Sequence, residues 1–167
     1  MTRRTRSPEE TKALAADLAT RIIKKGPAAR GATVVALYGR LGAGKTTFVQ
    51  GFYKGLGIKK VPASPTFILM RRTRIVRHSS SQRAKAGLRT RATAGKARFK
   101  NIFHIDAYRL RSGTDDHLGL RELFADPANL FLVEWPEHLA SFLPRSVLRI
   151  RFSHGKTSEE RRITFPS

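Results

Sequence analysis

The residues that most constrain the fold of this chain lie between 33 and 46, where a short apolar run leads into a glycine-rich segment. Residues 33–38 read TVVALY, a β-branched run typical of a strand buried on both faces. Residues 39–46 read GRLGAGKT and match the pattern G-x-x-x-x-G-K-[ST]. Glycines in this pattern let backbone N–H groups wrap a phosphate, and the next helix adds its positive N-terminal end. We therefore predict a strand, a phosphate-binding loop and a helix, which together bind a nucleoside triphosphate.

Four further residues are candidates for binding the phosphates and the metal ion next to this loop. Lys45 can reach the β- and γ-phosphate oxygens, and the hydroxyl of Thr46 can ligate Mg²⁺. The run LFLVE ends in Glu134, as a Walker B strand does, and the run IFHID ends in Asp106. Acids at the ends of neighbouring strands face the nucleotide in folds of this type, so we expect both carboxylates near the loop.

Strands and helices alternate along the chain, which predicts an α/β fold. We expect a three-layer P-loop NTPase sandwich, in which helices cover both faces of a mixed, mostly parallel sheet whose C-terminal strands are antiparallel. The strands are expected at Thr33–Tyr38, Thr66–Met70, Asn101–Asp106, Leu130–Glu134, Val147–Phe152 and Arg161–Phe165. The helices are expected at Pro8–Lys24, from Lys45 to Gly55 or Gly57, at His117–Phe124 and at Pro136–Phe142.

Composition narrows the class of protein. The 167 residues suit a single domain, and 40% of them are hydrophobic, which is enough for a core. The absence of cysteine excludes disulfides, thiolate metal sites and cysteine nucleophiles, and it fits a reducing cytoplasm. No apolar run approaches the roughly 20 residues of a membrane helix, and no secretory signal is readable at the N-terminus, so we expect a cytoplasmic protein without a membrane partner.

The net charge of +21 is concentrated in one part of the chain. Residues 71–100 hold 11 Lys and Arg residues and no acid. This tract is also poor in apolar periodicity, so we predict a basic, flexible insertion within a single domain spanning 1–167. It can be a tRNA-contacting arm, because clustered cations neutralise phosphates, or a solvated loop, because Phe99 is its only aromatic residue.

Four ordered motifs resemble those of the TsaE (YjeE) family of small P-loop ATPases in tRNA threonylcarbamoyladenosine biosynthesis. They are GRLGAGKTTF at 39–48, SPTF at 64–67, HIDAYRL at 104–110 and EWP at 134–136. The resemblance covers most of the chain from about residue 7 to 144. It implies that the protein acts with TsaB and TsaD, binds tRNA directly or through that complex, and resets the complex by hydrolysing ATP.

The resemblance also implies roles for individual residues. Asp106 would support Mg²⁺ together with Thr46, and Glu134 would orient or activate the attacking water, although the division of labour between the two acids stays open. Lys45, Asp106 and Glu134 are the catalytic candidates, and Thr46, Asp106 and Glu134 are the candidate ligands of Mg²⁺. The candidates for nucleotide binding are Gly39, Leu41, Gly42, Ala43, Gly44, Lys45, Thr46, Thr47, Ser64, Thr66 and Trp135.

The chain departs from the family pattern in three places, and two other functions stay open. Arg40 stands where the family usually has an acid, Ala107 replaces a usual leucine, and the basic tract replaces a short connection. The alternative functions to a TsaE-type ATPase are a small P-loop kinase with an Arg-rich lid and an ATP-regulated RNA-binding protein. A GTPase is disfavoured because no Asn-Lys-x-Asp tetrapeptide occurs. His104 is expected to be a packed strand residue, with contact to the site as the alternative.

Overall fold

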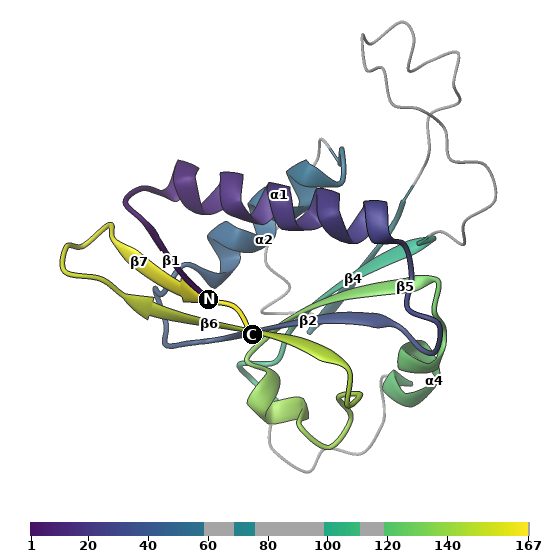
Figure 1. Cartoon of the computed structure of the whole chain (residues 1–167). Coiled ribbons are helices and arrows are strands. Elements are labelled where there is room, and N and C mark those ends of the chain that lie inside the picture. The colour runs from purple at the N-terminus through teal and green to yellow at the C-terminus, as the bar shows by residue number, and fades with distance from the viewer. Residues whose placement is uncertain (59–68, 76–98, 111–118, 167) are drawn as a thin grey trace, which may run out of the picture.

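The computed structural model describes residues 1–58, 69–75, 99–110 and 119–166 (Figure 1). Within these ranges, seven strands form one sheet in the order β1-β7-β6-β2-β5-β4-β3. The strands are β1 (Thr2–Thr5), β2 (Thr33–Tyr38), β3 (Met70–Arg74), β4 (Asn101–Asp106), β5 (Asn129–Glu134), β6 (Val147–His154) and β7 (Arg161–Thr164). The helices are α1 (Pro8–Lys25), α2 (Lys45–Gly55), α4 (Leu120–Ala125) and the 3₁₀ helix η1 (Pro136–Leu139).

The centre of the sheet is parallel and its two edges are antiparallel. Strands β6, β2, β5 and β4 run in the same direction, while β3 pairs antiparallel with β4, β7 with β6, and β1 with β7. The predicted α/β fold with a mixed sheet and antiparallel C-terminal strands is therefore confirmed. Because they are parallel, strands β2, β4 and β5 have their C-terminal ends on the same side of the molecule, and Asp106 and Glu134 lie at the ends of β4 and β5.

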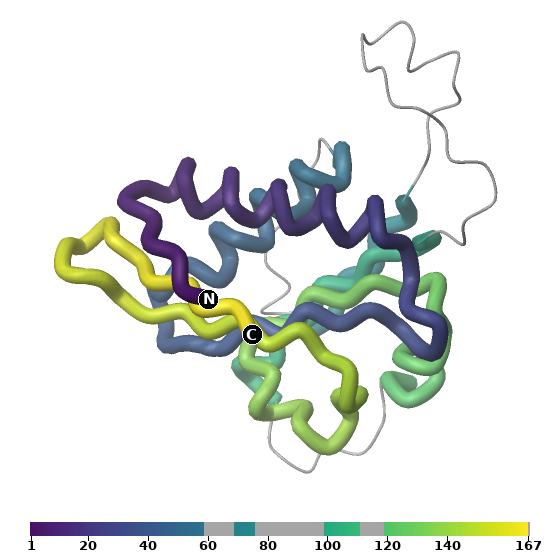
Figure 2. The backbone as a smooth tube through the Cα atoms, in the orientation of Figure 1, coloured from purple at the N-terminus to yellow at the C-terminus, as the bar shows by residue number. Residues whose placement is uncertain are grey.

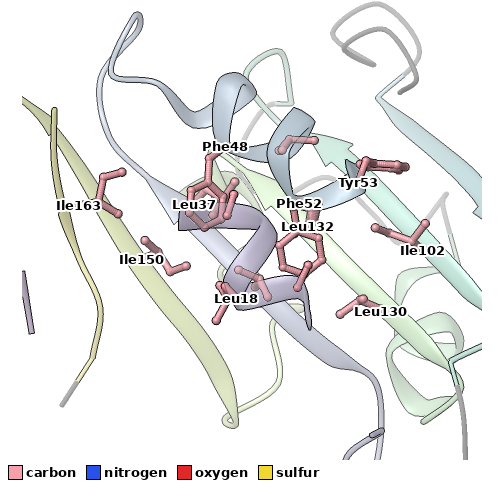
Figure 3. Close-up of a cluster of buried hydrophobic side chains, with 14 of the residues drawn as sticks. Leu18, Leu37, Phe48, Phe52, Tyr53, Ile102, Leu130, Leu132, Ile150 and Ile163 are labelled. Atoms are coloured by element: carbon pink, nitrogen blue, oxygen red, sulfur yellow. The ribbon is translucent and has the colours of Figure 1, made fainter. Parts of the chain in front are cut away.

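Helices α1 and α2 cover one face of the sheet and enclose the larger core (Figures 1 and 3). The two helices pack closely because α2 carries small residues at the contact. A Cβ atom at Gly51 would overlap the backbone of Lys12, and one at Gly55 would overlap the backbone of Ala16. Large side chains fill the space beneath the helices: Leu18, Phe48, Phe52 and Tyr53 from the helices, and Leu37, Ile102, Leu130, Leu132, Ile150 and Ile163 from the strands.

Helices α4 and η1 lie on the opposite face of the sheet and complete the third layer (Figure 2). Successive side chains of a strand point to opposite faces of the sheet, so the side chains that face away from α1 and α2 form a second core beneath α4 and η1. In β2, for example, Val35 and Leu37 belong to the first core, and Val34 and Ala36 to the second. Helices therefore cover both faces, as the sequence predicted.

The N-terminal residues of the chain form strand β1 and the N-terminal cap of helix α1. The side chain of Ser7 accepts a hydrogen bond from the backbone of Glu10 (3.1 Å) and so caps α1. The Glu10 carboxylate accepts from the backbone N–H of Arg6 (2.8 Å) instead of from Ser7. Strand β1 was not predicted, since its sequence TRRT has no apolar pattern and its pairing with β7 is a long-range contact.

None of the described helices has both the length and the hydrophobicity needed to span a bilayer.

The basic tract predicted at 71–100 is partly regular structure. Residues 70–74 form edge strand β3, which pairs with β4 through Met70↔Ile105 to Arg74↔Asn101, so 71–74 are a regular strand and not a flexible segment. Phe99 is buried in the first core, and Arg72 donates to the Asn101 side chain at 3.0 Å. The rest of the tract, 76–98, lies outside the described residues. The strand predicted at Thr66–Met70 is described only from Leu69 onward, where β3 begins at Met70.

Candidate nucleotide-binding site

The glycine-rich loop connects β2 to α2 and depends on backbone conformations that only glycine adopts easily. The φ angles of Gly39, Gly42 and Gly44 are 146°, 74° and 97°. A Cβ atom at Gly39 would lie 2.6 Å from the Phe152 carbonyl oxygen, so β6 passes directly beside the start of the loop. Helix α2 begins at Lys45, and its first N–H groups therefore open toward the loop, as an anion site requires.

A cavity of about 490 Å³ lies against this loop. Residues 41–47 form one wall, and the two predicted carboxylates, Asp106 and Glu134, form another. The other lining residues are Pro8, Thr11, Tyr108, Trp135, Ser158, Glu159 and Arg161. Of the nucleotide-binding candidates, Leu41, Gly42, Ala43, Gly44, Lys45, Thr46, Thr47 and Trp135 line the cavity. Ser64 and Thr66 lie outside the described residues, so their predicted role stays a prediction.

Lys45 is buried at the first position of α2 and its ammonium group points back into the loop. Its Nζ donates to the carbonyl oxygens of Gly39 (2.6 Å) and Arg40 (3.0 Å). It also lies 4.0 Å from the centroid of the Trp135 ring, a cation–π contact. Burial lowers the pKa of Lys45, and the nearby Glu134, Glu137 and Asp106 carboxylates oppose this change. The Lys45 ammonium group is thus partly desolvated and lies between two loop carbonyl oxygens and the Trp135 ring.

The two carboxylates come together because their strands are neighbours in register. Asp106 of β4 pairs directly with Glu134 of β5, and both residues are buried. The Thr46 hydroxyl donates to Glu134 Oε2 at 2.9 Å, which joins the loop to the end of β5. Asp106 Oδ1 accepts from the backbone N–H of Tyr108 at 3.2 Å, which fixes its orientation. The predicted convergence of Thr46, Asp106 and Glu134 on one cavity is what the structure contains.

His104 contacts Glu134 from inside the core, so it is both a packed strand residue and a neighbour of the site; its pairing with Glu134 was not predicted. Its Nε2 lies 2.8 Å from Glu134 Oε1, and the His104 side chain is 1% exposed. An ionised carboxylate can only accept, so an ionised Glu134 would accept this hydrogen bond from the Nε2–H of His104. His104 and Glu134 are two strand positions apart across β4 and β5, since His104 pairs with Leu132. The sequence signal for this His104–Glu134 contact is the spacing His-x-Asp at the end of one strand, when the neighbouring strand ends in Glu.

Trp135 closes the side of the cavity next to the loop. It follows Glu134 with a left-handed backbone (φ 57°) and precedes Pro136, which begins η1. This turn brings the ring back over Lys45 and within 4.9 Å, centroid to centroid, of the Tyr108 ring. Trp135, one of the nucleotide-binding candidates, therefore lines the cavity, and Tyr108 lines it beside Trp135.

The β6–β7 hairpin contributes a cation, Arg161, that no local sequence pattern predicts at this site. Arg161 donates through Nε to the Gly42 carbonyl oxygen at 3.2 Å, and through Nη1 to the carbonyls of Ser158 (2.6 Å) and Glu160 (2.9 Å). Its side chain therefore bridges the hairpin and the loop at the mouth of the cavity. Nothing local marks Arg161 among 33 Lys and Arg residues; the antiparallel pairing of β7 with β6 brings it to the loop.

The donor set at the cavity suits a magnesium ion held together with a phosphate. Within the described residues, no group of three or more His, Cys, Asp or Glu side chains could hold a metal by itself. Mg²⁺ is commonly held by one or two carboxylates, waters and substrate phosphates instead of a full protein cage. One hydroxyl and two carboxylates at the end of the phosphate-binding loop, Thr46, Asp106 and Glu134, fit that requirement.

Taken together, a parallel strand that enters a helix through a glycine-rich loop, and two carboxylates on adjacent strand ends, define a protein of the P-loop NTPase fold. The family model described as "Threonylcarbamoyl adenosine biosynthesis protein TsaE" matches residues 5–86 and 88–163. This chain belongs to the TsaE family and so to tRNA threonylcarbamoyladenosine biosynthesis.

Individual relatives agree with this assignment. The chain is 35% identical over 162 residues to the TsaE protein of Bacillus subtilis, covering 97% of this chain and 82% of that protein. It is 31% identical to the TsaE protein of Streptomyces coelicolor, covering 78% and 76% of the two chains. The crystal structure of Bacillus subtilis YdiB matches with a TM-score of 0.65 at 31% identity, covering 99% of this chain and 83% of that one. The P-loop fold predicted from the sequence is confirmed by this neighbour.

Proposed function

We propose that this chain is a magnesium-dependent ATPase subunit required for N6-threonylcarbamoyladenosine modification of tRNA, acting in the cytoplasm with TsaB and TsaD. The observation that carries the proposal is the convergence of Lys45, Thr46, Asp106 and Glu134 on one cavity beside the N-terminus of α2. Phosphoryl transfer depends on positioning and electrostatic stabilisation, and these are the groups that such a site needs.

Each residue has a distinct task in this proposal. Backbone N–H groups of the loop and the Lys45 ammonium bind the phosphate oxygens, which are stronger acceptors than the two loop carbonyls that Lys45 now contacts. Thr46 and Asp106 hold the metal, and Glu134 orients the attacking water. Mg²⁺ bound by these residues would neutralise the charge that develops on the phosphate oxygens. Arg161 stands beside the loop as a further cation for the same charge.

The partners decide how hydrolysis is used. We infer that ATP hydrolysis resets the assembly with TsaB and TsaD between rounds of modification, and that turnover by the isolated chain is slow because a reset step is useful only on its partners. The test is reconstitution with TsaB, TsaD, ATP and unmodified tRNA. We expect repeated modification cycles to require this chain and ATP, and the partners to increase ATP hydrolysis. Multiple turnovers without the chain, or an ATPase rate that the partners leave unchanged, would contradict the proposal.

We expect His104 to act as a positioning residue for Glu134. A buried carboxylate needs hydrogen-bond donors, and among the described residues the side chains of His104 and Thr46 are placed to donate to Glu134. His104→Leu removes the donor and is expected to lower kcat about 10–100-fold, as loss of an orienting partner does, with little change in KM. His104→Gln, whose amide N–H can reach the same oxygen, should recover most of kcat. Equal losses in the two variants at equal thermal stability would show that the donor is unimportant.

A further inference from the structure

One end of the sheet exposes a row of arginines on the same face as α4 and η1, beyond the part of that face that these helices cover. Strands β6, β7 and β1 form this antiparallel end, which lies beyond the α4–η1 layer (Figures 1 and 2). We call the patch the arginine face and define it by four exposed residues: Arg4 on β1, Arg149 and Arg151 on β6, and Arg162 on β7.

The register of the strands puts these four side chains on the same side of the sheet. Side chains alternate along a strand, so Arg149 and Arg151 share a face with Val147, which belongs to the second core, while Ile150 belongs to the first. Arg162 pairs with Ser153 of β6, which lies two positions beyond Arg151, and Arg4 pairs with Arg162. The guanidinium groups of three adjacent strands therefore gather over one surface.

The arginine face is poorly neutralised by the protein itself. Arg4 Nε lies 4.0 Å from Glu160 Oε1, a long ion pair. In the described part of the chain, no carboxylate oxygen lies within 4.0 Å of the side-chain nitrogens of Arg149, Arg151 or Arg162. Arg4 and Arg162 are also directly opposite each other across β1 and β7, and like charges in that position destabilise a strand pair. An anionic ligand would remove this repulsion.

Neutral groups on the same surface suit a phosphate backbone. The hydroxyls of Thr2 and Thr164 lie 3.0 Å apart in the row beside Arg151, and they can donate to phosphate or sugar oxygens. The guanidinium carbon of Arg151 lies 5.3 Å from the centroid of the half-buried Tyr38 ring, which holds the arginine by a cation–π contact. The face thus combines fixed cations, hydroxyls and one aromatic ring.

We propose that the arginine face binds the sugar–phosphate backbone of RNA, with tRNA as the ligand for a chain of this family. Arginine pairs with phosphate through a planar fork of donors, and the chain's net charge of +21 adds long-range attraction for a polyanion. The surface is distinct from the nucleotide cavity, because Arg161 alternates to the other side of β7 and contacts the phosphate-binding loop there. RNA binding here is therefore separable from ATP binding.

The test measures binding of a labelled, unmodified tRNA transcript to the full chain by fluorescence anisotropy at several salt concentrations. The variant is Arg151→Gln/Arg162→Gln. The matched control is Lys24→Gln/Lys25→Gln, which removes the same charge from the exposed end of α1. We expect the arginine variant to bind at least about tenfold more weakly, and its log–log salt slope to fall by about 2, one per lost phosphate contact. The control should keep nearly the wild-type slope.

One result would overturn the inference: an arginine variant with the affinity and salt slope of the control. Complete loss of tRNA binding on deletion of 76–98 would then assign RNA binding to that segment, and loss of TsaB or TsaD binding by the arginine variant would assign the arginine face to a protein partner. ATP hydrolysis measured on the same variants separates this inference from the proposed function, because the arginine face does not line the nucleotide cavity.

Discussion

Replacing Lys45 with alanine is expected to abolish nucleotide binding and to reduce ATP hydrolysis by at least about 10²–10³-fold, the scale seen when one transition-state contact is removed. The Lys45 ammonium is the buried cation that reaches into the loop, contacting the Gly39 and Arg40 carbonyl oxygens. Titration calorimetry with Mg·ATP and a phosphate-release assay measure the two effects. Trp135 fluorescence offers a third readout, because Lys45 Nζ lies 4.0 Å from its ring centroid.

The fold should survive this substitution, so the loss can be assigned to the site. Burial lowers the pKa of Lys45, which means that the folded state disfavours its charged form, and alanine removes that unfavourable desolvation. Lys54→Ala is the matched control, since Lys54 is exposed in the last turn of the same helix. A Lys45→Ala protein that still binds ATP with wild-type affinity, or a Lys54→Ala protein that fails equally, would contradict the proposed phosphate site.

The sequence was sufficient for the parts of the site that depend on local pattern. The strand–loop–helix unit around Lys45 is encoded within residues 33–55, where an apolar run, a glycine pattern and a helix start follow one another. Asp106 and Glu134 could be placed because each ends an apolar run. Parallel strands of such runs end at one edge of the sheet, and the register Asp106↔Glu134 follows that rule.

The parts that the sequence could not supply depend on pairing between strands that are far apart in the chain, either at the antiparallel edges of the sheet or between its parallel central strands. Strand β1 has no apolar face of its own, and it forms because β7 offers an unpaired edge. Arg161 reaches the loop only because the β6–β7 hairpin returns over it, and His104 meets Glu134 only once β4 and β5 are in register. Residues 71–74 read as part of a basic tract because an edge strand tolerates charge and shows little alternation.

Glu134→Gln is expected to separate hydrolysis from binding. The substitution keeps the size of the side chain and an oxygen that can accept from the Thr46 hydroxyl, but it removes the basic carboxylate that would activate water. We expect ATP affinity within about threefold of wild type and a loss of turnover of about 10²–10⁴-fold, the usual range for one general base. Single-turnover hydrolysis, measured beside calorimetry, distinguishes the two quantities. Glu137→Gln is the control, because Glu137 is exposed on η1 but still close enough to influence Lys45.

Comparison with Asp106→Asn assigns the two carboxylates to different tasks. If Asp106 holds the metal, Asp106→Asn should raise the Mg²⁺ concentration needed for half-maximal activity, whereas Glu134→Gln should lower the maximal rate at saturating Mg²⁺. The structure gives the physical basis: Glu134 is held by His104 and Thr46 on its two oxygens, while Asp106 is oriented by the backbone of Tyr108. A Glu134→Gln protein whose rate is restored by high Mg²⁺ would mean that Glu134 is the metal ligand, and that water activation belongs to another group.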